Sequence, residues 1–278
     1  MITNALELMV PILFAALGGL LTERAGVLNI GLEGLILTGA FAGIAGANLT
    51  GSLAAGLATG AVAGVLLAGV YSVACIELRS NIFVAGLATN LLAAGVVPYL
   101  SALLYDTKGV VRLQIDPGFP SVAGVSMMVV LSVFVAAVIT VLLFRTPFGM
   151  RLRATGGNPD ALPARALDPN HYRRIAMLAS GLFAGFAGAE VSLRLGVYLP
   201  NISAGRGWIA LVAIFLGARH PLGAVGAALI FAFFESFAGA AQGFTTIPGT
   251  LLLGLPYLIT LLAMVLYSAL GRRARIER

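Results

Sequence analysis

The chain has 278 residues, of which 59% are hydrophobic and only 10% charged, and its formal net charge is +6. Soluble domains carry about 25% charged residues, so this composition excludes a soluble globular protein of this size. The positive charge is therefore interpreted as a guide to membrane orientation, and we expect no binding of nucleic acid.

Apolar runs of about 20 residues, the length that crosses a hydrocarbon core about 30 Å thick, recur from one end of the chain to the other. They predict an all-α fold, a polytopic transmembrane helix bundle of about 8–10 spans that forms a single domain over residues 1–278. Residues 208–218 are too few for a straight crossing and predict a half-helix, or one that extends back into 203–207. The predicted spans are 6–21, 27–47, 53–76, 82–104, 123–144, 175–197, 208–218, 222–241 and 250–270.

Glycines spaced four residues apart occur in three of these spans. Small residues at this spacing let membrane helices approach closely, although a chain with 35 glycines also produces some such pairs by chance. We interpret the series at 56–64 as a close helix contact. The spaced glycines are Gly39 and Gly43, then Gly56, Gly60 and Gly64, then Gly181 and Gly185.

Basic residues are distributed unevenly between the two sides of the membrane that the predicted spans define. If the polar loop 145–174 lies in the cytoplasm, 13 basic residues fall on that side, whereas Lys108, Arg112 and Arg206 fall on the other. Such an excess is what the positive-inside rule predicts. We therefore expect the amino terminus outside and the carboxyl terminus in the cytoplasm.

The single lysine excludes one way of binding ATP. A phosphate-binding loop needs lysine directly after glycine, whereas Lys108 follows Thr107. Cys75 is the only cysteine, which excludes an internal disulfide and a cysteine metal cluster. No nucleophile–base pair is apparent either, so we expect no catalysis, no metal and no cofactor, with any ATP bound by partner subunits.

The loop 145–174 contains a helix-start pattern. Asn158 can cap free backbone amides, Pro159 is tolerated at the first helical position, and Asp160 suits the positive end of the helix dipole. The pattern predicts a short helix over 159–167. Two interpretations remain open from the residues alone: a helix that docks into a groove of another protein, or a solvated linker.

Placing a charged side chain at membrane depth costs about 2.5–3.5 kcal/mol of insertion free energy, so such residues usually face a cavity or a partner. Glu33 and Asn29 lie one turn apart, if 27–47 is one helix, and could support a pathway or serve as structural hydrogen bonds. Glu190 and Arg194 are spaced to form an ion pair that aids insertion. The candidate translocation-path residues are Asn29, Glu33, Asn90, Glu190 and Glu235.

Three stretches carry a family resemblance. Residues 23–34 read ERAGVLNIGLEG, which resembles the signature near the amino terminus of ABC importer permeases of the ribose, branched-chain amino acid and nucleoside group. Residues 149–159 read GMRLRATGGNP, which resembles the cytoplasmic loop where that family places a coupling helix against its ATPase. Residues 202–211 read ISAGRGWIAL and, with FLG at 215–217, are similar to the simple-sugar and nucleoside subgroup.

The resemblance implies a multi-pass permease subunit in a bacterial or archaeal plasma membrane that forms the path for a nucleoside or simple sugar by alternating access. It also implies three protein partners beside membrane lipid: ABC ATPase subunits, a second permease in a heterodimer, and an extracytoplasmic solute-binding protein. The positions that match the family's ATPase contact are Gly149, Arg151, Arg153, Ala154, Thr155, Gly156, Asn158 and Pro159.

Two other classes of membrane protein remain as alternatives. An ion-coupled secondary transporter would use Glu33 or Glu235 as its coupling carboxylate and would need no ATPase. A structural or assembly protein would have no path at all. The loop 145–174 discriminates between these classes, because a secondary transporter has no use for a docking helix.

Overall fold

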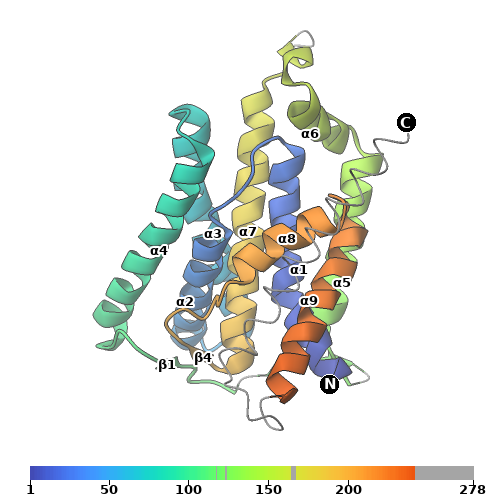
Figure 1. Ribbon diagram of the computed structural model, residues 1–278. Coiled ribbons are helices and arrows are strands. Elements are labelled where there is room, and N and C mark those ends of the chain that lie inside the picture. Colours follow the sequence, from blue (N-terminus) through green and yellow to red (C-terminus); the bar gives the residue numbers. More distant parts are fainter. Residues whose placement is uncertain (117, 123, 164–166, 242–278) are drawn as a thin grey trace.

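The computed structural model describes residues 1–116, 118–122, 124–163 and 167–241, and Figure 1 shows them as an upright bundle of long helices. Seven helices in this part of the chain are long and apolar enough to cross a membrane, which confirms the all-α polytopic fold. The predicted span 250–270 lies outside the described residues. The seven are α1 Ile2–Arg24, α2 Leu32–Thr50, α3 Leu53–Ser72 with its π-helical extension η1 Val73–Glu77, α4 Ile82–Tyr105, α5 Met127–Arg145, α7 Pro169–Leu195 and α9 Pro221–Ala241.

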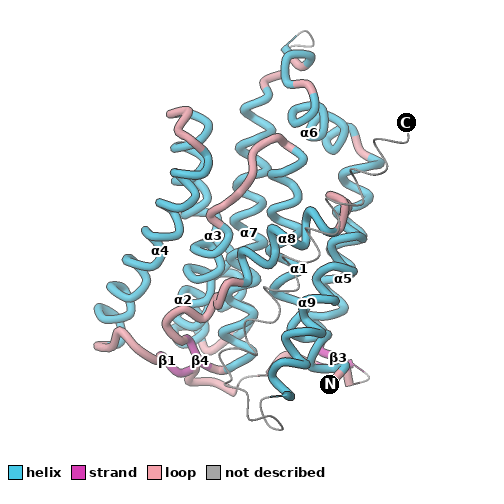
Figure 2. Tube along the Cα trace, in the orientation of Figure 1, coloured by secondary structure: helices cyan, strands magenta, loops and turns pink. Residues whose placement is uncertain are grey.

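Short elements mark the two ends of the bundle. At one end, which we name the α6 end, lie α6 Pro147–Gly157 and the 3-10 turn η2 Pro159–Ala161. At the opposite end, which we name the strand end, two small antiparallel pairings occur (Figure 2). They join β1 Val111–Arg112 to β4 Val197–Tyr198, and β2 Ser121–Val122 to β3 Val125–Ser126. The two ends of the bundle therefore differ: one carries a short helix and the other carries short strands.

Helix α7 is the centre of the fold and packs against α1, α2 and α3. Its contact with α3 is made by glycines: a Cβ added at Gly185 would lie 2.9 Å from the Cα of Gly64 and would overlap the carbonyl of Gly60. A Cβ added at Gly60 would in turn lie 2.8 Å from the carbonyl oxygen of Gly39 on α2. The close contact predicted from the series at 56–64 is thus confirmed, and it joins three helices.

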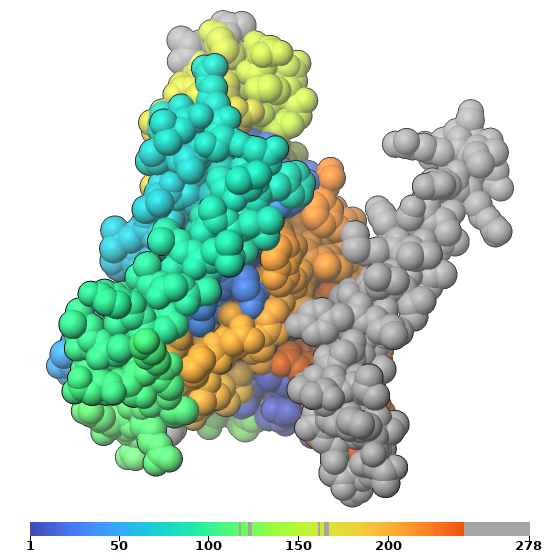
Figure 3. Space-filling model, turned by 60° about the vertical axis from the view of Figure 1, so that its left-hand side comes forward, coloured from blue at the N-terminus to red at the C-terminus, as the bar shows by residue number. Residues whose placement is uncertain are grey.

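The outer helices expose much of their apolar surface. Leu91 on α4 is 74% exposed, and Figure 3 shows α4 (teal) lying over the face of the molecule on that side. Helix α1, in contrast, is buried along most of its length, with Leu13 and Leu17 fully enclosed. Exposed apolar helix surface of this kind suits lipid or another membrane subunit.

The predicted helix over 27–47 is wrong at its start. Helix α2 begins at Leu32, and the preceding segment is irregular. Asn29 accepts a hydrogen bond from the backbone N–H of Gly31 (2.9 Å), a local bond that competes with helix formation. The pairing of Asn29 and Glu33 on one helical face is therefore wrong as well.

A second span is interrupted in the same way. Helix α8, Arg206–Leu216, follows an irregular segment, and the residue just before it, Gly205, has a φ of 80°. Figure 1 shows α8 (orange) running obliquely from the middle of the bundle toward the α6 end. The expectation of a half-helix here is confirmed. The amino-terminal ends of α2 and α8 meet inside the bundle, at the contact described below.

In place of the start of the helix predicted over 159–167 the structure has only the 3-10 turn η2, and residues 164–166 of that prediction lie outside the described residues. The α-helix of this loop lies earlier. Thr146 caps α6 by accepting a hydrogen bond from the N–H of Gly149 (3.1 Å), and Pro147 occupies the first helical position. Asn158 makes no side-chain cap and is followed only by η2. The next helix, α7, is capped by Asp168, which accepts from the N–H of Asn170 (2.9 Å).

Candidate functional site

Two asparagines satisfy the backbone groups at the break before α2. Asn90 on α4 accepts from the N–H of Gly34 (2.8 Å) and donates to the carbonyl of Ile30 (3.0 Å). Asn29 is fully buried and donates to the hydroxyl of Ser180 on α7 (2.8 Å). Backbone freed from a membrane helix needs such partners, since no water reaches it there. Two of the predicted path residues therefore stabilise this break.

Glu33 connects the two interrupted spans. Its carboxylate accepts from the N–H of Gly205 on one oxygen and from the N–H of Gly207 on the other, each at 2.8 Å. These amides belong to the free amino-terminal end of α8, where a helix dipole favours negative charge. Glu33 also lies in the first turn of α2, so one carboxylate serves the amino-terminal ends of both helices.

A chain of charged side chains lies beside this contact. Arg206, in the first turn of α8, pairs with Glu235 on α9 (2.6 Å). On α7, Arg194 pairs with Glu190 (3.0 Å), as its spacing predicted, and lies 3.9 Å from Glu7 on α1. Arg206 does not belong to an outer loop as expected, because its side chain is only 11% exposed within the bundle.

The first turn of α8 is therefore the place where the polar interior of the bundle converges. We name this contact the α8 junction: Glu33, Gly205, Arg206, Gly207 and Glu235. The backbone of the turn binds α2 through Glu33, and its side chain binds α9 through Arg206. Gly207 permits the approach, since a Cβ at this position would overlap the backbone of Glu33.

The structure thus brings Asn29, Glu33 and Asn90 together and places Glu190 and Glu235 in the adjacent charged chain. Sequence reasoning missed Arg206 as an interior residue, and it missed the two glycines beside it. The signal was an arginine between two glycines, directly ahead of an apolar run. Glycine on both sides of a charged residue at membrane depth indicates a close backbone approach.

Replacing Arg206 with methionine is expected to lower the free energy of unfolding by about 3 kcal/mol, because Glu235 then remains in the bundle without its counter-charge. The double variant Arg206→Met/Glu235→Met is expected to recover most of this loss, since no charge remains unpaired. Thermal unfolding in detergent measures both. Equal stability of the single variant and the wild type would show that the pair contributes nothing.

Helix α6 is held to the bundle by two glycines two turns apart. Gly149 packs on the backbone at the end of α5, where a Cβ would overlap the carbonyls of Leu142 and Leu143. Gly156 packs on the backbone at the end of α1, where a Cβ would lie 2.8 Å from the nitrogen of Gly26. A side chain at Gly156 would therefore displace α6 from α1, so Gly156 positions the helix.

The predicted coupling residues divide between two faces of α6. Thr155 is buried, and the guanidinium of Arg153 lies 4.9 Å from the ring centre of Phe144 on α5. Arg151 is exposed and lies near the hydroxyl of Tyr172 (3.4 Å), while Met150, which was not predicted, is 61% exposed. The exposed face can contact another protein, and the other face fixes the helix to the bundle.

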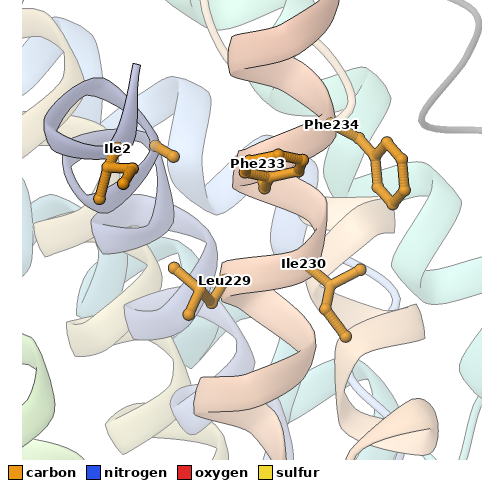
Figure 4. A pocket seen from close by; sticks show the side chains of 6 residues that line it. Ile2, Leu229, Ile230, Phe233 and Phe234 are labelled. Carbon is orange, nitrogen blue, oxygen red and sulfur yellow. The ribbon is translucent and has the colours of Figure 1, made fainter.

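The apolar cavities of the bundle do not suit a polar solute. One, of about 550 Å³, lies between the start of α1 and the middle of α9. Figure 4 shows Ile2 facing Leu229 and Phe233 across it. Another, of about 540 Å³, is lined by Leu21, Ile139, Phe183 and other apolar residues of α1, α5, α6 and α7. Among the described residues that line them, neither cavity has a hydrogen-bonding side chain that could recognise a sugar or base.

Comparisons with known proteins agree with this architecture. A family model described as branched-chain amino acid transport system / permease component matches residues 1–269. The nucleoside ABC transporter permease protein NupC of Lactococcus lactis subsp. cremoris is 31% identical, over 96% of this chain and 91% of the relative. The guanosine ABC transporter permease protein NupQ of Bacillus subtilis is 32% identical, over 91% of this chain and 87% of the relative.

A third relative, the putative glucose ABC transporter permease protein TsgC13 of Haloferax volcanii, is 31% identical over 76% of this chain and 68% of the relative. No solved structure matches the chain. Because the family model covers almost the whole sequence and the described part contains seven candidate membrane spans, the protein belongs to the branched-chain amino acid transport system permease family, the multi-pass membrane subunits of ABC transporters.

Proposed function

We propose that this protein is the permease subunit of an ABC importer whose solute is a nucleoside. The observation that carries the proposal is the identity of 31–32% to two permeases, one named for nucleosides and one for guanosine, over more than nine-tenths of the chain. The permease of sugar type is matched over a smaller share of the chain. The ATPase and the extracytoplasmic binding protein are separate partners, and we propose a second permease as the other half of a heterodimer.

The α6 end is proposed to face the cytoplasm. In the described residues, eight arginines lie at this end, whereas Lys108, Arg112 and Arg194 lie at or near the strand end. Positive charge is retained on the cytoplasmic side of a membrane protein. This orientation places the amino terminus outside, and it places the exposed face of α6 where an ATPase can bind it.

The α8 junction is proposed to transmit motion to the path. ATP-driven closure of the ATPases would shift α6, whose two glycine contacts lie on the ends of α5 and α1. Helix α1 packs against α8 and α9, which the junction connects to α2. Asn29, Glu33, Asn90, Glu190 and Glu235 are proposed to support interrupted helices beside the path, and the binding protein supplies most of the selectivity.

The ion-coupled alternative receives no support from these contacts. Glu33 accepts two backbone hydrogen bonds, and Glu235 is paired with Arg206. A coupling carboxylate must gain and lose its ion during each cycle, whereas both of these carboxylates are engaged in holding helices together. The family assignment also points to an ATP-driven system.

Uptake measurements test the proposed solute. Cells that express the permease with its ATPase and binding protein are expected to accumulate labelled guanosine, and depletion of ATP without collapse of the ion gradients is expected to stop uptake. Labelled ribose and leucine serve as the competing solutes. Accumulation of ribose or leucine in place of guanosine would overturn the nucleoside assignment but leave the importer intact.

The variant Met150→Glu tests the coupling surface. A carboxylate in the exposed apolar centre of a protein contact is expected to reduce co-purification of the ATPase at least tenfold, because the charge must lose its water on binding. Solubility and thermal stability of the permease are expected to remain unchanged, since the side chain is 61% exposed. The matched control is Gln114→Glu, an equal change of charge at an exposed residue near β1. If the ATPase co-purified normally with the Met150→Glu variant, its binding surface would lie elsewhere than the exposed face of α6.

A further inference from the structure

A polar cavity at the α6 end is distinct from the α8 junction and from the exposed face of α6. It has a volume of about 410 Å³ and lies among the segment before α2, the π-helical turn η1, the start of α4 and the start of α7. The polar side chains that line it include Arg79, Asn170 and Arg173, and Cys75 also lines it. No acidic residue lines it.

The two arginines of this cavity lack carboxylate partners in the described part of the chain. Arg173 donates to the side-chain oxygen of Asn170 (3.3 Å), and its Nε is buried without a hydrogen bond. Arg79 is exposed at the edge of the cavity, and no hydrogen bond or ion pair of its side chain is found among the described residues. A buried donor left unpaired is costly, so the Nε of Arg173 favours an anion in the cavity, and the nearby charge of Arg79 adds to that preference.

The acidic side chains near the cavity are already engaged. Glu77 pairs with Arg174 (2.8 Å), and Asp168 lies 3.9 Å from the same guanidinium. Arg174 thus takes both carboxylates, and the positive charge of Arg79 and Arg173 is left uncompensated. An internal salt bridge therefore does not explain why these two arginines lie together.

The backbone around Arg79 is irregular in a way that regular helix packing would not require. Helix α3 ends in the π-helical turn η1, a form that is rare and frequent at functional sites. Arg79 itself has a φ of 51°, a left-handed conformation that costs energy for a residue with a Cβ. This strain coincides with the position that brings Arg79 to the edge of the cavity.

We propose that this cavity binds the phosphate group of an anionic phospholipid. Guanidinium groups bind phosphate oxygens through paired hydrogen bonds. The cavity lies at the α6 end, where α3 ends and α4 and α7 begin. The proposal rests on the proposed orientation, which places this end on the cytoplasmic side, where basic cavities between helices recognise such headgroups. A free phosphate ion offers the same chemistry, and the experiment separates the two sources.

Occupancy of this cavity would affect the contact between α6 and the segment that follows α1. Gly26 lines the cavity, and a Cβ at Gly26 would lie 2.9 Å from the Cα of Gly156. The site is independent of the transported solute, and its failure would leave the proposed function unaffected. Its success would add a lipid requirement beside the coupling helix.

The test is native mass spectrometry of the detergent-solubilised permease titrated with phosphatidylglycerol and, separately, with phosphatidylcholine. The wild type is expected to bind one phosphatidylglycerol in preference to phosphatidylcholine. Arg79→Gln and Arg173→Gln are each expected to weaken that binding about fivefold. The matched control is Arg145→Gln, which removes an exposed arginine at the same end of the bundle but outside the cavity.

Competition with inorganic phosphate identifies the source. Displacement of the lipid only at phosphate concentrations far above those in cells supports the lipid, whereas displacement at low millimolar phosphate assigns the cavity to a soluble anion. Equal binding of phosphatidylglycerol by the wild type and both cavity variants would overturn the proposal.

The single cysteine gives a readout that needs no substitution. Cys75 lines the cavity, so phosphatidylglycerol is expected to slow its reaction with a charged thiol reagent in the wild-type protein, and phosphatidylcholine is not. An unchanged rate with both lipids would also count against the site, even if one of the arginine variants failed to fold.

Discussion

Replacement of Glu33 with alanine is expected to lower ATP-driven uptake at least tenfold and to reduce the free energy of unfolding by about 3 kcal/mol. The substitution leaves the N–H groups of Gly205 and Gly207 without acceptors inside the bundle. Hydrogen bonds to a charged group contribute about 1.5–3 kcal/mol each, and the two lost here share one carboxylate, so their effects are not additive. The contact between the two interrupted helices is then lost. Uptake assays and thermal unfolding in detergent measure the two effects.

Two further variants at Glu33 separate charge from hydrogen bonding. Glu33→Gln retains one acceptor oxygen and is expected to fall between alanine and the wild type in stability. Glu33→Asp retains the charge but has a shorter side chain that cannot reach both amides in the present geometry. Wild-type uptake and stability in Glu33→Ala would show that the α8 junction carries no function.

The second large effect is expected at Gly185, where leucine should prevent the permease from accumulating as a folded protein. A Cβ at this position would meet the backbone of Gly64 on α3 at 2.9 Å, and backbone cannot move aside as a flexible side chain can. Overpacking of a well-packed interior typically costs about 1–3 kcal/mol and more where the neighbour is rigid. Separation of α3 from α7 would also disturb α2, which meets the same glycines.

The matched control is Gly226→Leu on α9, because a Cβ at Gly226 meets nothing within 4 Å. Fluorescence-detected size-exclusion chromatography of the membrane extract is expected to give a sharp peak for the control and an aggregated or absent peak for Gly185→Leu. Gly185→Ala is expected to be intermediate. A sharp peak for Gly185→Leu at wild-type yield would contradict the close packing of these helices.

The position of the coupling helix shows where local sequence patterns compete. Asn158 and Pro159 predict a helix start, but in the structure Thr146 caps α6 and Pro147 is its first residue. Both pairs satisfy the local preferences for a helix start, so local propensity does not distinguish them. The choice depended on Gly149 and Gly156, which fit α6 against the backbones of α5 and α1. Tertiary packing of this kind cannot be recognised from the loop alone.

The interrupted spans show a different limit. Apolar composition identifies residues 27–47 as membrane-embedded, and length marks 208–218 as too short to cross. Composition cannot show that the amino-terminal ends of α2 and α8 meet, since Glu33 and Gly205 are 172 residues apart in sequence. Glu33 was a candidate because a charge at membrane depth is costly, but its partners are backbone amides, and these have no signature in side-chain chemistry.

The sequence by itself determined that this is an all-α membrane protein, that it contains no phosphate-binding loop, and that several polar residues lie within its apolar spans, although it missed Arg206. These properties follow from composition and from the length of apolar runs, which the bilayer constrains directly. Only the tertiary structure decided which groups these polar residues satisfy, and which face of α6 is exposed. The reason is that every unpaired backbone or charged group in the bundle must find a partner, and that partner comes from whichever helix packs beside it.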